Sequence, residues 1–246
     1  MPVLMVRRAA VALALGVAAF VTAAASAQVP PEAPARPRTP RPNMQAMNEA
    51  LGVRCVYCHV PGTSQAEDID FKSEANPKKR IARMMVAMTA DINAAVPSAM
   101  LKAPGEVTAV TCATCHRGVP DPRPLPEIIW RTLEREGTDA AIAQYRDLRA
   151  RFFGKDAYDF SDRAILTVAQ RAVDYAPESA LAMLTMNLEF HPQSADSLVL
   201  MARAETRRLD DRAAIVLLER ALAIDPKHAL AQGFLLQLRQ FVRPRP

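Results

Sequence analysis

Residues 55–59 read Cys-Val-Tyr-Cys-His, and residues 112–116 read Cys-Ala-Thr-Cys-His. These two pentapeptides contain all four cysteines of the 246-residue chain. Cys-x-x-Cys-His is the attachment signature of c-type haem, in which both thiols form thioethers with the vinyl groups and the adjacent histidine binds the iron. The sequence therefore predicts two covalently bound haem c groups. The predicted attachment and iron-binding residues are Cys55, Cys58, His59, Cys112, Cys115 and His116.

Two other uses of four cysteines compete with this interpretation. Two Cys-x-x-Cys pairs can form a tetrahedral zinc site, and an even number of cysteines can form disulfides. Neither alternative explains the histidine that follows each pair. A two-residue loop between paired cysteines is also more typical of redox motifs than of structural disulfides. Haem c is therefore the favoured prediction.

The composition favours helices over sheets. Glycine is scarce, with 8 residues, and aromatic residues make up only 5% of the chain, whereas alanine, leucine, arginine and methionine are abundant. We expect an all-α protein. The formal charge of +5 becomes +3 without Arg7 and Arg8, and the other basic residues are scattered, so no nucleic-acid partner is predicted.

The N-terminus has the pattern of a secretory signal over residues 1–27. Arg7 and Arg8 precede an apolar run at residues 9–25, and Ala-Ser-Ala at residues 25–27 fits a cleavage site. We therefore expect the protein to be exported to the periplasm, the compartment in which haem c is attached. An uncleaved membrane anchor is the alternative, but the run is only just long enough to span a bilayer.

Proline marks two predicted linkers. Residues 28–42 contain six prolines, and residues 119–126 contain four. Such segments form stiff, extended spacers. The first linker follows the predicted signal peptide and precedes a haem domain at residues 43–118. The second separates that domain from a helical domain at residues 127–246.

A methionine-bearing helix is predicted before each haem motif. The first runs from an N-cap at Asn43 to a stop at Gly52. The second begins with Asn76 as N-cap and Pro77 at the first helical position. Its first turn is basic, which opposes the helix dipole and suggests an acidic partner or a haem propionate nearby. Its periodicity places four apolar residues on one face: Ile81, Met85, Met88 and Ile92.

An electron-transferring haem iron usually has a sixth ligand. The two remaining histidines, His191 and His228, lie far downstream beside prolines and are predicted to be surface loop residues. Both methionine helices carry Met-x-x-Met. Methionine at helical spacing can also be core packing, so the residues alone leave both roles open.

The segment from about Asn43 to Gly118 resembles the cytochrome subunit of photosynthetic reaction centres. The resemblance rests on the two Met-x-x-Met helices and on the stretch Val-Thr-Cys-Ala-Thr-Cys-His-Arg-Gly at residues 110–118. In that family each haem unit is a helix, a turn and a second helix with the Cys-x-x-Cys-His motif. The resemblance implies that Met44 ligates the His59 haem and Met85 the His116 haem, with Met47 and Met88 as fallback ligands.

The C-terminal part resembles tetratricopeptide repeats. Pro192 and Pro226 lie 34 residues apart, which is the period of that repeat. Small residues fall where two repeat helices pack closely, at Ala180, Ala202, Ala214 and Ala221. Such repeats often grip another protein, and a stabilising cap on the haem domain is the alternative.

These features together predict an exported dihaem cytochrome that passes single electrons between redox proteins, one of which could be a membrane-bound complex. No acid–base or nucleophile constellation is recognisable, so we expect a carrier rather than an enzyme. A dihaem peroxidase or reductase is one alternative and would need an open iron and distal acid–base groups. A haem-based sensor or assembly protein that acts through the repeats is another.

Overall fold

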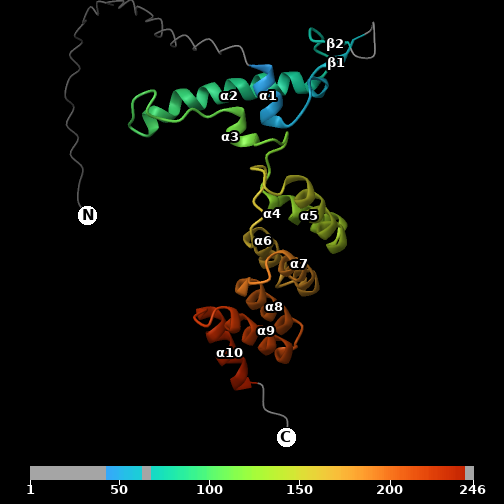
Figure 1. The fold of residues 1–246 in the computed structure, drawn as a ribbon, viewed down its shortest axis with the longest axis vertical. Coiled ribbons are helices and arrows are strands. Elements are labelled where there is room, and N and C mark those ends of the chain that lie inside the picture. The colour runs from blue at the N-terminus through green and yellow to red at the C-terminus, as the bar shows by residue number, and fades with distance from the viewer. Residues whose placement is uncertain (1–42, 63–67, 242–246) are drawn as a thin grey trace, which may run out of the picture. The chain divides into compact units, whose positions relative to one another are not determined.

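A computed structural model describes residues 43–62 and 68–241 (Figure 1). Within these ranges ten α-helices form nearly all of the regular structure, which confirms the all-α prediction. The predicted signal peptide and the first proline-rich linker lie outside the described residues. In the described ranges, no helix is long and apolar enough to cross a membrane.

Helix α1 (Met44–Leu51) is bounded by the residues that the sequence predicted. The Asn43 side chain accepts hydrogen bonds from the backbone N–H groups of Gln45 and Ala46, at 3.0 and 3.2 Å. Gly52 ends the helix in the left-handed conformation with φ of 64°. These caps satisfy backbone groups that a short helix otherwise leaves unpaired.

Helix α2 (Pro77–Ala99) is the longest in the described chain. Asn76 caps it through the Lys78 N–H at 3.0 Å, and Pro77 occupies the first turn, as predicted. None of its 23 residues is buried. Because packing of an apolar face normally stabilises a helix, α2 lacks the usual protein partner over its length.

A small two-stranded hairpin interrupts the otherwise helical structure. Strand β1 (Val60–Pro61) pairs antiparallel with β2 (Ile69–Asp70). The hairpin follows the first haem motif directly.

The two Cys-x-x-Cys-His motifs adopt short helical turns. Cys55–Tyr57 forms the 3-10 turn η1, and Cys112–His116 forms helix α3. Helix α1 packs against α3, and the Gly118 N–H donates to the Ala50 carbonyl at 2.8 Å. A Cβ at Gly52 would lie 2.2 Å from the Gly118 carbonyl oxygen, so this approach requires glycine.

The rest of the described chain is a succession of helices in which each packs on the next along the sequence, α4 on α5 and α6 through α10 in turn (Figure 1). Pairs two apart, such as α4 with α6 and α6 with α8, also touch. Helix α4 begins at Leu125, inside the predicted second linker, because Pro124 and Pro126 suit a helix start. The helices are α4 (Leu125–Glu136), α5 (Thr138–Phe152), α6 (Asp162–Ala172), α7 (Pro177–Phe190), α8 (Ala195–Arg207), α9 (Asp211–Ile224) and α10 (Ala229–Phe241).

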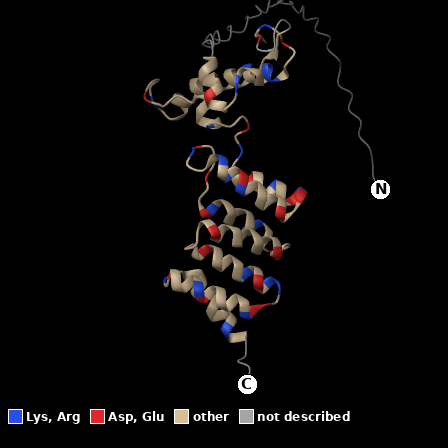
Figure 2. Cartoon of the chain, turned by 45° about the vertical axis from the view of Figure 1, so that its right-hand side comes forward, with Lys and Arg blue, Asp and Glu red and all other residues tan. Residues whose placement is uncertain are grey.

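Three apolar clusters form the core of these helices, with Tyr145, Leu218 and Leu184 among their fully buried members. The alanines predicted at close helix contacts are all inaccessible to solvent: Ala180, Ala202, Ala214 and Ala221. Helices α8 and α10 start 34 residues apart, at Ala195 and Ala229. The tetratricopeptide assignment itself stays a prediction. Basic and acidic residues are interspersed along the helices (Figure 2).

Candidate functional site

The first motif borders a cavity of about 390 Å³. Helix α1, the motif itself, Phe71 and one side of α2 enclose it. Burial raises the pKa of the Cys58 thiol, which reflects the apolar character of this wall. Its lining residues are Met44, Met47, Asn48, Leu51, Val53, Cys55, Cys58, His59, Phe71, Lys79, Ala82, Arg83 and Val86. A cavity of this size and lining suits a cofactor.

His59 is held in this cavity by packing. Its ring meets the Phe71 ring edge-on, with centroids 5.0 Å apart. Its Nδ1 is buried and has no hydrogen-bond partner. A buried polar atom without a partner is costly, so the ring of His59 lacks the second-shell hydrogen bond that a histidine ligand usually makes.

Both methionines of α1 line the same cavity as His59. Met44 is 54% exposed, whereas Met47 is half-buried. Asn48, one turn along, donates to the Cys55 sulfur at 3.6 Å. The predicted ligand Met44 and its fallback Met47 therefore border the same space as the motif.

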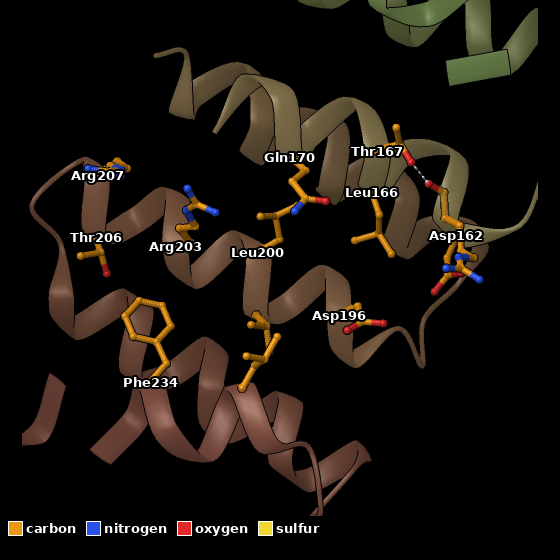
Figure 3. A pocket seen from close by; sticks show the side chains of 13 residues that line it. Asp162, Leu166, Thr167, Gln170, Asp196, Leu200, Arg203, Thr206, Arg207 and Phe234 are labelled. Carbon is orange, nitrogen blue, oxygen red and sulfur yellow. Dashed lines mark hydrogen bonds between the residues drawn. The ribbon is translucent and has the colours of Figure 1, made fainter. Parts of the chain in front are cut away.

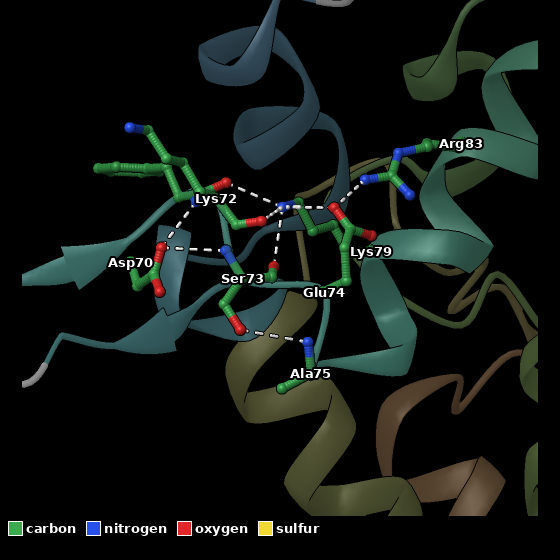
Figure 4. A network of polar contacts seen from close by, with 8 residues as sticks. Asp70, Lys72, Ser73, Glu74, Ala75, Lys79 and Arg83 are labelled. Atoms are coloured by element: carbon green, nitrogen blue, oxygen red, sulfur yellow. Dashed lines mark hydrogen bonds and ion pairs between the residues drawn. The ribbon is translucent and has the colours of Figure 1, made fainter.

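A polar network forms one rim of the cavity (Figure 4). Lys79 Nζ donates to the backbone carbonyls of Phe71 and Ser73 at 2.8 and 2.9 Å and pairs with Glu74 at 3.0 Å. Arg83 also binds Glu74. Hydrogen bonds from Arg83 and Lys79 lower the pKa of Glu74 to about 2. Lys79, in the basic first turn of α2, thus binds the loop at residues 71–74 of the same chain.

The second motif is arranged differently around its histidine. Thr111 and Thr114 close a capping box at the start of α3. His116 Nδ1 lies 3.0 Å from the Val119 carbonyl oxygen, which fixes Nδ1 as the protonated nitrogen and leaves Nε2 for a ligand. Cys112 is half-buried and Cys115 is exposed.

Helix α2 connects the two motifs through two asparagines. The Asn76 side chain donates to the Tyr57 carbonyl at 3.1 Å, within the first motif. Asn93 donates to the Val110 carbonyl at 2.8 Å and accepts from the Val110 N–H at 2.7 Å, just before the second motif. With 1.5 Å of rise per residue, these two anchors are about 25 Å apart along the helix.

The predicted apolar face of α2 is only partly correct. Met85 and Ile92 are half-buried, but Ile81 is 54% and Met88 is 44% exposed. The half-buried stripe passes instead through residues such as Ala82, Met85 and Val86.

The structure gives no support to the zinc and disulfide alternatives. All four thiols are free. Among the described residues, no three His, Cys, Asp or Glu side chains come together as a metal site.

The two downstream histidines are engaged locally. His191 ends α7 and its Nε2 contacts the Phe160 carbonyl at 3.0 Å. His228 Nε2 contacts Asp196 at 3.0 Å, and its side chain is only 13% exposed. Both lie in loops between helices as predicted, but they are half-buried rather than on the open surface.

The helical stack carries a groove of about 940 Å³ that sequence reasoning did not locate. Helices α6, α8 and α10 line it, and Leu166, Leu200 and Phe234 contribute apolar side chains to it (Figure 3). Acidic and basic residues lie at different positions along α8: Asp196 in the first turn, Arg203 and Arg207 towards the last. The groove could not be predicted from the sequence, because the helical pattern does not show which helices lie next to one another.

Comparison with known proteins bears on the segment that contains both motifs. Residues 43–154 match the family described as photosynthetic reaction centre cytochrome C subunit. Over these residues the chain is similar to that family of c-type cytochromes. The match runs past Gly118 and includes α4 and α5, beyond the boundary that the sequence predicted for the haem domain.

One relative in the family is the photosynthetic reaction center cytochrome c subunit of Thermochromatium tepidum. It is 36% identical to this chain over 78 residues, which is 32% of this chain and 15% of the relative. The chain thus spans about 15% of the length of that relative.

Proposed function

We propose that this protein is an exported electron carrier with two covalently attached haems. The observation that supports this most is the first cavity, where both thiols of a Cys-x-x-Cys-His motif, its histidine and two methionines line one apolar space. Cysteine thiols, an imidazole and a thioether are the groups that hold a c-type haem and its iron. A bound haem supplies an iron that gains and loses one electron.

The residues present fit such a group on independent grounds. His59 Nδ1 is buried without a partner, and α2 has no buried residue over 23 positions. The second of these features suits a chain that packs on a large apolar cofactor. Cys55 and Cys58 would attach the first haem with His59 as its proximal ligand, and the corresponding residues of α3 would hold the second: Cys112, Cys115 and His116.

Methionines would complete both iron sites, Met44 for the first and Met85 for the second. A thioether ligand favours reduced iron and raises the reduction potential. Two such ligands leave no open position for a substrate, which favours electron transfer over peroxidase chemistry. The N-terminal signal would place the protein in the periplasm, with a redox protein as its partner.

The groove between α6, α8 and α10 is the proposed docking surface for a partner polypeptide. Asp162 and Asp196 lie towards one end, whereas Arg203 and Arg207 share a single acid, Asp174, at the other. An extended segment with a basic residue at the first end and an acidic residue about 10 Å away would complement both.

The carrier proposal is tested by counting haems on the mature protein. Intact-mass analysis and a haem spectrum should give two haems per chain, with the weak far-red band of a methionine–iron bond in the oxidised state. Met44→His and Met85→His should each remove the far-red band of one haem and lower the reduction potential of that haem. One high-spin haem that binds cyanide readily would contradict the proposal.

The docking surface is tested by photocrosslinking in the full chain. A crosslinker at Gln170, which faces the groove (Figure 3), should capture one partner at a peptide with the charge order described above. The control position is Arg220, an exposed residue of α9 outside the groove. Equal capture from both positions, or a captured peptide without that charge order, would overturn the docking proposal.

A further inference from the structure

We infer that the protein makes the reduction potential of the first haem site, at His59, higher than that of the second, at His116. The inference rests on the proposed function and names the direction in which an electron moves between the two sites. It follows from three differences between the surroundings of the two motifs: the proximal histidine, the enclosure and the nearby charge.

The first difference concerns the histidines. A carbonyl acceptor on Nδ1 makes the imidazole a more basic ligand, and a more basic ligand stabilises oxidised iron. His116 has such an acceptor in Val119, at 3.0 Å. His59 Nδ1 is buried and has none. The proximal histidine of the second site therefore lowers the reduction potential of that site relative to the first.

The second difference is enclosure. An oxidised haem carries one more positive charge than a reduced one, so an apolar and water-poor surrounding disfavours the oxidised form. The first site has a cavity with the half-buried apolar residues Leu51 and Val53 in its wall, and both of its cysteines are half-buried. In the second motif Cys115 is exposed.

The third difference is how strongly water screens the nearby charge, because Arg117, the cation next to His116, is exposed, whereas a cation beside the first motif is largely buried. Lys79 and Arg83 both line the first cavity, and they share one carboxylate, Glu74. The three groups together carry a net charge of +1. The Lys79 side chain is only 14% exposed, so its field is weakly screened by water. A cation beside the haem disfavours oxidation, which again raises the potential of the first site.

All three differences have the same sign, so an electron that enters at the second site moves to the first. The electron lost by the His116 haem is the one gained by the His59 haem, and no other reactant is needed. Helix α2, anchored to both motif segments by Asn76 and Asn93, holds the two sites on one rigid element.

The test is a potentiometric titration of the full mature protein, followed by its visible spectrum. Two one-electron steps with separate midpoints are expected. Arg83→Gln changes the charge of the network from +1 to neutral and should lower only the upper step. The expected change in the reduction equilibrium constant is roughly 3- to 10-fold, or roughly 30–60 mV at 59 mV per tenfold. Glu74→Gln changes the charge to +2 and should raise the same step.

The matched control is Arg80→Gln, which removes an exposed cation of α2 that does not line the cavity and should move neither step. The opposite signs of the Arg83 and Glu74 variants separate a charge effect from a structural one, since loosening the rim would shift both alike. Removal of the second haem by Cys112→Ala/Cys115→Ala should leave the upper step alone.

Two results would overturn the inference: a single midpoint for both haems, or an Arg83→Gln shift confined to the lower step. A protein that carries fewer than two haems would contradict the proposed function instead, so the two failures are distinguishable by the haem count of the same sample. Should the double cysteine variant fail to mature, the paired Arg83 and Glu74 shifts still decide the question.

Discussion

The described residues of the segment 43–118 and the helices of residues 125–241 are stabilised in different ways. The helical stack has three buried apolar clusters built from its own side chains. In the first segment Ala50 alone is buried among the described residues, although it contains the longest helix. A chain that leaves so much apolar surface outside a core needs a further apolar partner to fold. This difference supports the proposal that haem forms the core of that segment.

The largest expected effect follows from loss of one attachment site. Cys55→Ser/Cys58→Ser should leave one haem on the chain and make residues 43–76 a site of rapid proteolysis, because the first cavity loses its filling. Intact mass and limited proteolysis measure both outcomes. Protease resistance equal to that of the unaltered protein would show that this segment does not depend on the haem.

The second prediction concerns the apolar core of the C-terminal helices. Leu218 is fully buried, and Leu218→Ala should lower the free energy of unfolding of α8–α10 by about 2–5 kcal/mol while the haem spectrum stays unchanged. Thermal unfolding followed by circular dichroism gives the stability. Leu236→Ala, at a position 64% exposed, is the control and should change stability by less than about 0.5 kcal/mol.

A smaller effect is expected where the two motif segments meet. Gly52 has φ of 64°, and a Cβ there would clash with the Gly118 carbonyl. Gly52→Ala should cost about 1–2 kcal/mol for the left-handed backbone and more for the clash. Gly105→Ala isolates the backbone contribution, since Gly105 also has a positive φ but has nothing within 4 Å of its added Cβ. Equal losses of stability in the two variants would exclude the clash.

The smallest effect is the acid response of the cavity rim. The pKa of Glu74 is lowered from 4.5 to about 2 by Arg83 and Lys79. Its contribution to stability is therefore complete above pH 4.5 and is lost as the pH falls towards 2. Glu74→Gln should be less stable at neutral pH and should show a weaker dependence on pH in that window. Glu49→Gln, outside the network, is the control in the same acid titration.

Local features were predictable from the sequence, and features that depend on tertiary packing were not. The caps at Asn43, Gly52 and Asn76 follow from residue types next to one another in the chain. The exposure of Ile81 and Met88 depends on which segments pack on α2, and periodicity gives only one idealised face. The different surroundings of His59 and His116 could not be predicted either, because the contacts with Phe71 and Val119 depend on how the chain folds around each ring.

The central claim is that residues 43–118 take their core from haem, and hydrogen exchange of the full mature chain tests it most directly. The comparison is between protein with attached haem and protein produced without haem attachment. The account predicts that amides of α2 are protected with haem and exchange rapidly without it, whereas those of α4–α10 are equally protected in both samples. Equal protection of α2 in the two samples would contradict the claim.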